Sequence, residues 1–201
     1  MSETASHTHR MPGAHIADPA PLGLAGFALT TFVLSTVNAN IVPQALVGGA
    51  LGAALGYGGL AQFAAGLWEF AKGNTFGATA FCSYGGFWIS FWWLAEHDLA
   101  NLGPDGHKVV GVYLLAWAIF TGYMSIAAMK VNMAVLTVFV LLTITFLALC
   151  IGWFDNVSTG WIKLGGYLGL ATALVAWYTS MAGVTAFTWG RQVFPVGAPR
   201  E

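Results

Sequence analysis

The sequence contains very few charged residues, and this scarcity excludes most classes of soluble protein. Only 7% of its 201 residues are charged and 57% are hydrophobic, whereas about a quarter of the residues in a soluble domain are charged. Five long stretches contain no charged residue and no histidine, namely 19–68, 73–95, 109–129, 131–154 and 164–190. We therefore expect an integral membrane protein whose helices use lipid as their solvent.

Other features that the sequence lacks reduce the number of possible functions. The net charge is only −1 and no basic amphipathic stretch occurs, which argues against nucleic-acid binding and against a peripheral membrane anchor. The two cysteines, Cys82 and Cys150, lack the spacing of a metal or redox site and are expected to be small buried apolar residues. No span offers a Ser–His–Asp set, metal-ligand spacing or a carboxylate pair, so we predict no enzyme, no metal site and no cofactor.

Glycine and proline residues divide the apolar stretches into six expected transmembrane helices, which makes the fold class all-α. Each is near or above the ~20 residues that cross a bilayer. Their expected bounds are 22–42, 44–70, 74–95, 109–129, 133–154 and 161–189. The domain organisation expected from this division is a mobile N-terminal tail over 1–17, a transmembrane domain over 18–190 and a C-terminal tail over 191–201.

The positive charges predict that both termini are cytoplasmic. Six spans place the two termini on the same side of the membrane, and lysine and arginine are enriched in cytoplasmic loops. The cations expected on the side of the termini are Arg10, Lys72, Lys130, Arg191 and Arg200, and those on the other side are Lys108 and Lys163. The N-terminal tail lacks the apolar core of a cleaved signal peptide, and its His7, His9 and His15 are expected to be solvated.

Small polar residues recur at helical spacing in the first and third spans. In the first span, one helix face is expected to carry Phe27, Thr31, Ser35 and Asn38. In the third span, a polar line is expected to run along Thr75, Thr79 and Ser83, with Tyr84 beside it. Such lines are typical of a path through the membrane, although hydroxyls that bond to their own helix and an asparagine that joins neighbouring helices would leave the same pattern.

The second span contains a ridge of small residues and two polar side chains. Gly48, Gly52 and Gly56 recur every four residues, which predicts a close helix contact, within or between subunits. Gln62 makes either a bond between helices or a contact to substrate. Glu69 is expected at the cytoplasmic end of the span, where its charge stays solvated in an ion pair with Lys72.

The far end of the third span is rich in tryptophan. Trp88, Trp92 and Trp93 are expected in the outer aromatic belt of the membrane. The residues that follow them, from Glu96 to Asp98, are adjacent in sequence and point in different directions on a helix, so a solvated loop is expected there rather than a metal site.

Several long motifs resemble one family of transport proteins. The motifs are DPAPLGLAGFALTT at 18–31, YGGLAQFAAGLWEFAKGNTFGATAFCSYGGFW at 57–88, GVYLLAW at 111–117 and LTITFLALCIG at 142–152. They resemble the succinate–acetate permease (acetate uptake transporter) family, whose signature is an NPAPLGL segment that opens the first helix. The resemblance implies passage of monocarboxylates or small dicarboxylates through a homohexamer in the plasma membrane, with one path in each subunit.

The resemblance also implies roles for particular residues. The family's narrow point falls on Phe27, Tyr84 and Leu142. Counted from expected helix starts at Asp18, Asn74 and Met133, these residues lie nine or ten positions along their helices, which at ~1.5 Å per residue is half of a ~30 Å bilayer core. The sequence departs from the family pattern at Asp18, where Asn is usual, and at Asn40, where Gly is common.

The other site residues are expected to be hydrogen-bonding groups. Those expected to bind substrate are Thr30, Thr31, Ser35, Asn38, Gln62, Thr79, Ser83 and Tyr84. Those expected at the membrane interface, where substrate would arrive, are Asp18, Glu69 and Asn74. Hydrogen-bond donors of this kind bind an acid weakly enough to release it, which conduction requires.

A transported carboxylate would have no cation to pair with inside the expected spans. A carboxylic acid is almost wholly ionised at neutral pH, given reference pKa values near ~4, and an unpaired anion in a dry interior is costly. We therefore expect that any proton crosses on the substrate and that flux rises as the external pH falls. The alternatives are a channel for another small neutral solute and a membrane sensor or structural protein. The paired NPA boxes of water channels and the histidines of an ammonium path are missing from the spans.

Overall fold

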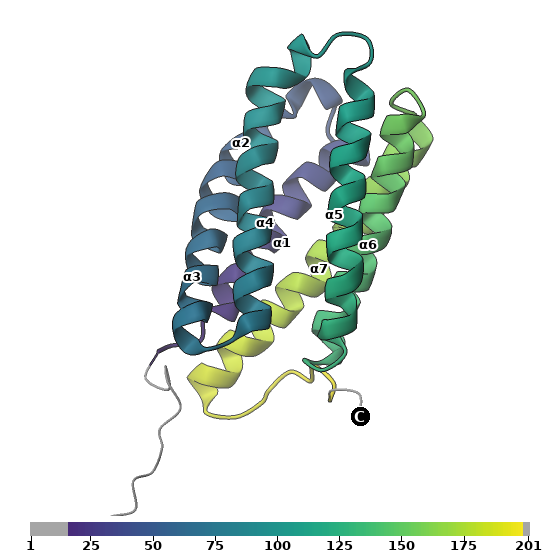
Figure 1. Ribbon diagram of the computed structural model, residues 1–201. Coiled ribbons are helices and arrows are strands. Elements are labelled where there is room, and N and C mark those ends of the chain that lie inside the picture. The colour runs from purple at the N-terminus through teal and green to yellow at the C-terminus, as the bar shows by residue number, and fades with distance from the viewer. Residues whose placement is uncertain (1–15, 199–201) are drawn as a thin grey trace, which may run out of the picture.

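The computed structural model describes residues 16–198, and within this range the fold contains helices and no strand. The predicted all-helical class is therefore confirmed. In chain order the elements are α1 (Ala20–Asn38), η1 (Gln44–Leu46), α2 (Gly48–Ala53), η2 (Ala54–Ala61), α3 (Gln62–Lys72), α4 (Thr75–Trp93), η3 (Leu94–Asp98), η4 (Leu99–Asn101), α5 (Gly106–Ala128), α6 (Met133–Phe154) and α7 (Thr159–Trp189). Figure 1 shows them as one elongated bundle.

Five helical runs of the described chain are long and apolar enough to cross a membrane, namely Ala20–Asn38, Gln44–Lys72, Gly106–Ala128, Met133–Phe154 and Thr159–Trp189. The run Gln44–Lys72 joins four elements end to end, with the π-helical turns of η2 in its middle. α4 also has 19 residues, and its glycine, hydroxyl and tryptophan side chains leave it outside this set of five. The expected bounds agree with the observed helices to within a few residues.

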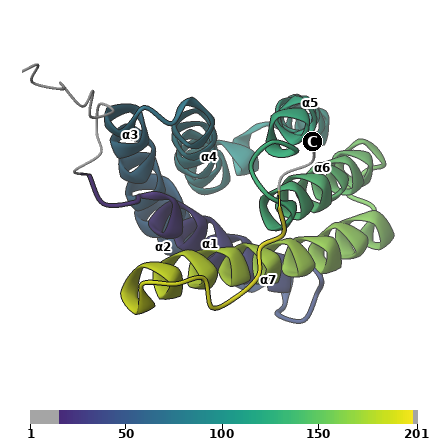
Figure 2. The ribbon, with the colours of Figure 1, turned by 90° about the horizontal axis from the view of Figure 1, so that it is seen from below.

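The bundle is held together by helix pairs. α7 packs along α1, α6 lies between α5 and α7, and α3 packs on α4 (Figure 2). Both ends of the described chain lie at the same end of the bundle (Figure 1). The C-terminal segment is tied to this end, because the Tyr178 hydroxyl donates to the Pro195 carbonyl at 2.6 Å and the Ala134 N–H donates to the Val196 carbonyl at 2.9 Å.

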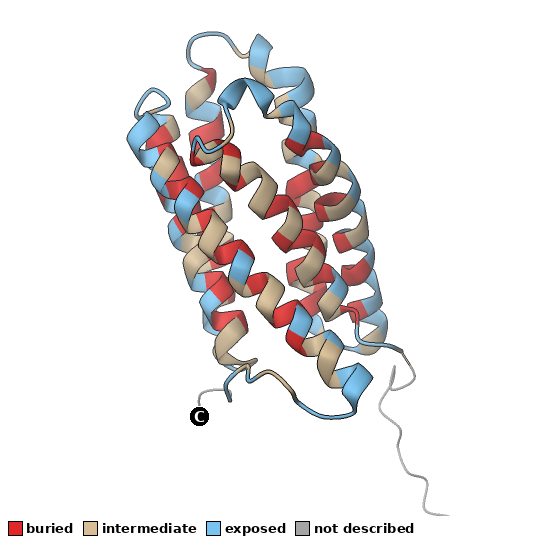
Figure 3. Ribbon diagram, turned by 180° about the vertical axis from the view of Figure 1, so that it is seen from behind, coloured by how far each residue is buried: buried red, intermediate tan, exposed pale blue. Residues whose placement is uncertain are grey.

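The outer surface of the bundle is largely apolar. Ile119, Ile126 and Phe187 are 63, 65 and 80% exposed, and the buried residues lie on the faces that the helices turn toward one another (Figure 3). Exposed apolar side chains at this density are unfavourable in water and favourable in hydrocarbon. The surface therefore matches the membrane environment that the composition predicts.

The close helix contacts do not lie where the glycine ridge predicts them within the subunit. No heavy atom would lie within 4 Å of a Cβ added at Gly48, Gly52 or Gly56, so this part of the prediction is wrong. The close approaches lie instead at Gly26, where a Cβ would lie 2.7 Å from the Tyr57 carbonyl oxygen, and at Gly66, where it would lie 2.5 Å from the Cys82 nitrogen. A contact of the ridge with another subunit stays a prediction.

Candidate functional site

A cavity of about 390 Å³ lies between α1, α4, α5, α6 and α7. It reaches from the middle of the bundle to the end opposite the termini, where the loop residue Asn40 and Trp153 line it. Its innermost lining residues on α1 and α6 are Phe27 and Leu142. These two side chains therefore close the cavity near the middle of the bundle.

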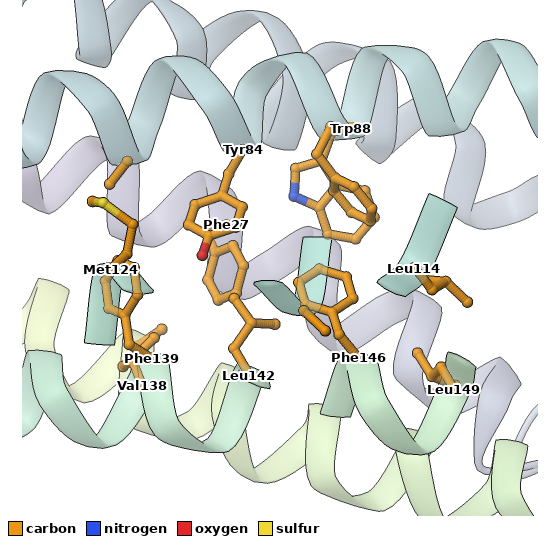
Figure 4. Packing of buried hydrophobic residues seen from close by; sticks show 14 of the residues in the cluster. Phe27, Tyr84, Trp88, Leu114, Met124, Val138, Phe139, Leu142, Phe146 and Leu149 are labelled. Atoms are coloured by element: carbon orange, nitrogen blue, oxygen red, sulfur yellow. The ribbon is translucent and has the colours of Figure 1, made fainter. Parts of the chain in front are cut away.

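The three residues of the expected constriction meet in one layer. Phe27, Tyr84 and Leu142 are all buried, at 4, 3 and 4% exposure. The Phe27 and Tyr84 rings are tilted with their centroids 5.7 Å apart, and Leu142 lies beside the Phe27 ring in Figure 4. Tyr84 does not itself line the cavity, so Phe27 separates it from the open space. The role of this layer as a constriction stays a prediction.

The Tyr84 hydroxyl is engaged inside the bundle. Its oxygen lies 2.9 Å from Thr121 Oγ1, and Thr121 Oγ1 donates to the Trp117 carbonyl at 2.7 Å. A hydroxyl has one hydrogen to donate, so Thr121 accepts from Tyr84. The Tyr84 oxygen is left with lone pairs, which can only accept a hydrogen bond from a passing molecule.

The polar face expected on the first span lines the cavity. Thr31, Ser35 and Asn38 all border it on α1, one or more turns beyond Phe27. Sequence reasoning did not single out Thr145 as a site residue, yet it lines the cavity from α6, where its hydroxyl bonds to the Leu141 carbonyl at 2.8 Å. Thr145 lies three residues after Leu142, and this spacing is the feature of the sequence that could have identified it.

Five of the eight expected substrate-binding residues do not line this cavity, namely Thr30, Gln62, Thr79, Ser83 and Tyr84. Thr30 donates to the Ala53 carbonyl at 3.2 Å and packs against Gly58. Gln62 is 1% exposed and neither of its side-chain polar atoms has a hydrogen-bond partner among the described residues. The structure therefore brings together the α1 half of the expected polar lining and leaves the α4 half on another face of its helix.

Trp88 corrects the expectation of an outer aromatic belt. Its side chain is 3% exposed and lines the cavity instead of facing lipid. The indole Nε1 is buried and has no hydrogen-bond partner among the described residues. Trp88 lies one turn after Tyr84 on α4, and this four-residue spacing from a constriction residue was the sequence signal that could have found it.

The mouth of the cavity carries one positive charge. Lys163, on the second turn of α7, is the only charged residue among the described residues that line the cavity. Sequence reasoning used Lys163 only as a marker of topology. A cation and several hydroxyl and amide donors, with no carboxylate among them, favour anions over cations in this space.

At the terminal end of the bundle, the expected ion pair is replaced by another. Lys72 Nζ lies 2.7 Å from Asp18 Oδ1 and does not pair with Glu69. Asp18 Oδ1 also accepts from the Ala20 N–H at 3.2 Å, and the helix begins at Ala20 with Pro19 as its N-cap. The Asp18–Lys72 pair links the start of α1 to the end of α3.

Glu69 corrects a second expectation, because it is completely buried and not solvated. Its exposed fraction is 0%, and the Asn74 side chain lies beside its carboxylate. The carboxyl group packs closely against Gly77 on α4. A Cβ added at Gly77 would lie 2.9 Å from Glu69 Oε1. Asn74, beside it, caps α4 by accepting from the Gly77 N–H at 3.1 Å. None of Asp18, Glu69 and Asn74 lines the cavity.

Some expectations fall on residues outside the described range. These are the solvated histidines His7, His9 and His15 and the terminal cations Arg10 and Arg200.

The apolar outer surface and the cavity that Phe27 and Leu142 close at its inner end define a helical membrane protein of the channel or transporter class. The chain belongs to the GPR1/FUN34/yaaH family, which it matches over residues 2–194. It is 39% identical over 190 residues to the "Succinate-acetate/proton symporter SatP" of Escherichia coli, covering 93% of this chain and 98% of that protein. The solved "Structure of the bacterial acetate channel SatP" superimposes with a TM-score of 0.83 at 39% identity, covering 90% of this chain and 99% of that one.

A yeast relative carries a different name. The chain is 44% identical over 179 residues to "Ammonia transport outward protein 2" of Saccharomyces cerevisiae, covering 86% of this chain. This chain spans just under two thirds of the length of that relative, at 63%. The relatives thus include proteins named for acetate and for ammonia, and the residues of this chain must decide between them.

Proposed function

We propose that the protein conducts acetate and related small mono- or dicarboxylates, succinate among them, across the plasma membrane. The observation that carries this proposal is the cavity that ends at Phe27 and Leu142, since its one charged lining residue is the cation Lys163. α4 serves as the sixth span beside the five more apolar ones. With six spans and cytoplasmic termini, the cavity opens to the outside.

The lining suits a carboxylate better than ammonium. Lys163 attracts an anion at the mouth and repels a cation, while Ser35 and Asn38 offer donors further in. Donors without full charges bind an acid weakly enough for it to leave again. The constriction itself offers apolar walls, so a small acid with a short tail is favoured over a bulky one.

The proton is proposed to cross on the substrate. An anion at Phe27 and Leu142 would face a large desolvation cost, which a neutral acid avoids. Tyr84 supports this choice, since its hydrogen points to Thr121 and its lone pairs can accept from the O–H of a protonated acid. Glu69 is the buried carboxyl that could instead relay a proton, and it lies off the cavity.

The assembly is proposed to be a homohexamer with one path in each subunit. The cavity lies within a single chain, so no second copy is needed to form its walls. The exposed Gly48, Gly52 and Gly56 ridge offers a surface on which a helix of another copy can approach closely.

Uptake of labelled acetate into proteoliposomes tests the proposal. Purified protein should give saturable acetate uptake that unlabelled succinate inhibits and that benzoate and ammonium do not inhibit. A sensor or structural protein would give no uptake, and a channel for another neutral solute would give uptake that acetate does not saturate. Equal transport of acetate and benzoate would overturn the proposed selectivity.

A further inference from the structure

We propose that Trp88 and Thr31 form a two-donor subsite that binds the carboxyl group of the substrate as it enters the Phe27 and Leu142 constriction. This inference rests on the proposed function and adds Trp88 to the residues that contact the acid. It assigns a chemical task to two buried polar atoms that the fold leaves unused.

Trp88 Nε1 and Thr31 Oγ1 are both buried and both lack a hydrogen-bond partner among the described residues. Buried donors in folded proteins are nearly always paired, because an unpaired one costs about 1–3 kcal/mol. Most other hydroxyls of the bundle follow this rule, as Thr145 and Thr179 do by bonding to carbonyls of their own helices. Two unpaired groups that both belong to the cavity lining point to a ligand that pairs them.

The two residues occupy equivalent positions next to the constriction. Thr31 follows Phe27 by four residues on α1, and Trp88 follows Tyr84 by four residues on α4. Each therefore lies one turn further along a helix that starts at the terminal end of the bundle. Figure 4 shows the Trp88 indole in the layer next to Phe27 and Tyr84, with its nitrogen on the side of the ring that faces them.

The indole N–H of Trp88 and the hydroxyl of Thr31 are hydrogen-bond donors, and this determines which ligand they can bind. An indole N–H can only donate, and a threonine hydroxyl can donate as well. A carboxyl group has two oxygens that can accept one hydrogen bond each, whereas ammonium has no lone pair and cannot accept at all. The indole N–H of Trp88 therefore has nothing to offer ammonium, and the pair of donors favours an acid.

The subsite lies on the cavity side of Phe27, because Thr31 and Trp88 both line the cavity one turn beyond the Phe27 and Tyr84 layer. Both polar atoms are covered in this closed arrangement, and Phe27 and Leu142 must separate before any solute passes. An acid that enters from the mouth meets the two donors before it separates Phe27 and Leu142, so its carboxyl group gains two protein hydrogen bonds as it loses water. It then passes on to the lone pairs of Tyr84.

Saturable uptake of acetate and of propionate by Trp88→Phe and Thr31→Val in proteoliposomes tests the subsite. Phenylalanine keeps an aromatic ring and removes the N–H, and valine keeps the shape of threonine and removes the hydroxyl. Loss of one hydrogen bond to a charged or strongly polar group should raise KM about tenfold for Trp88→Phe, and severalfold for Thr31→Val. The two acids share the carboxyl group and differ in the tail, so KM should rise by the same factor for both.

Trp92→Phe is the matched control. Trp92 packs edge-on against Trp93 and His97 and does not line the cavity, so its substitution should leave both KM values unchanged. The double variant Trp88→Phe with Thr31→Val should raise KM by less than the product of the single effects, because the two groups hold one ligand.

The outcomes separate the subsite from the proposed function. An unchanged KM in both single variants, with normal uptake by the wild type, overturns the subsite alone. A change in the ratio of acetate to propionate KM overturns it too, because the residues would then be shaping the space for the tail. If Trp88→Phe fails to assemble, the KM values of Thr31→Val test the subsite by the same criteria. No saturable acetate uptake by the wild type would overturn the proposed function and the subsite together.

Discussion

Tyr84 and Thr121 share a hydrogen bond of 2.9 Å inside the bundle, with Tyr84 as the donor. This bond engages the only hydrogen of the Tyr84 hydroxyl. At the proposed constriction, Tyr84 would therefore offer only lone pairs to a substrate, which favours a protonated acid over its anion.

Replacing Thr121 by valine should weaken this preference. Without its acceptor the Tyr84 O–H is free to donate to an anion, so acetate flux should fall less steeply as the external pH rises above the pKa of the acid. Removing the partner also leaves a buried hydroxyl unpaired, at a cost of about 1–3 kcal/mol of folding stability. Acetate flux between pH 5 and pH 8 measures the effect. Thr179→Val is the control, since Thr179 bonds only within its helix at 2.8 Å, and an equal change there would contradict the interpretation.

Shortening Leu142 should widen the path. Leu142→Ala removes a buried side chain that closes the cavity and should admit benzoate, with about a tenfold gain in benzoate flux relative to acetate. The cavity it leaves should also destabilise the fold by about 2–5 kcal/mol. Flux of both acids and the melting temperature give the two readouts. Continued exclusion of benzoate in a folded Leu142→Ala variant would mean that the narrow point lies elsewhere.

Neutralising Lys163 should weaken capture of the acid. Lys163→Gln removes the only cation among the described residues that line the cavity, and KM for acetate should rise about two- to fivefold at low salt, as expected for a partly exposed charge. The difference from the wild type should shrink at high salt because the attraction is screened.

Lys108→Gln is the matched control for Lys163. Lys108 is exposed and lies 2.6 Å from Asp105 Oδ1, and this hydrogen bond holds the pKa of the Asp105 carboxyl below its usual value. Its side chain does not line the cavity, so KM should stay at the wild-type value. Equal effects of the two substitutions would indicate a general surface charge effect.

Neutralising Glu69 should leave the pH dependence of transport intact. Glu69→Gln keeps the shape of a buried side chain that lies off the cavity, and flux should still rise as the external pH falls because more protonated acid is present. Asp18→Asn and Glu96→Gln should behave in the same way. Acetate flux against pH in the three variants is the measurement. A variant that transports acetate without any pH dependence would reveal a proton relay on the protein.

Gly52→Leu should disrupt the oligomer and spare the subunit. The space around Gly52 is open within one chain, so a leucine there interferes only with a neighbouring copy. Gel filtration in detergent should show smaller particles with helical content unchanged. Gly66→Leu is the contrasting variant, because a Cβ there would lie 2.5 Å from the Cys82 nitrogen and should disrupt the fold itself. Wild-type particle size in Gly52→Leu would contradict a role of the ridge in assembly.

The sequence by itself determined the helices and one wall of the site. Long apolar stretches without charge can satisfy their backbone only as helices in lipid, and the sequence contains five such stretches, which glycine and proline divide into six expected helices. The face of α1 that carries Phe27, Thr31 and Ser35 also follows from the sequence, because residues three and four apart share a side of any helix. Local geometry is enough for both conclusions.

Only the tertiary structure decided which side of the other helices faces the cavity. α4 is apolar or weakly polar on all sides, so its sequence does not say whether Thr79 and Ser83 or Trp88 turn inward. The packing of α4 against α3 turns Trp88 to the cavity and leaves the hydroxyls on another face. Glu69 is buried for the same reason, since Gly77 on α4 lets the carboxyl group pack closely. The rotation of a helix about its own axis depends on the shapes of its neighbours, and these come from parts of the chain far away in sequence.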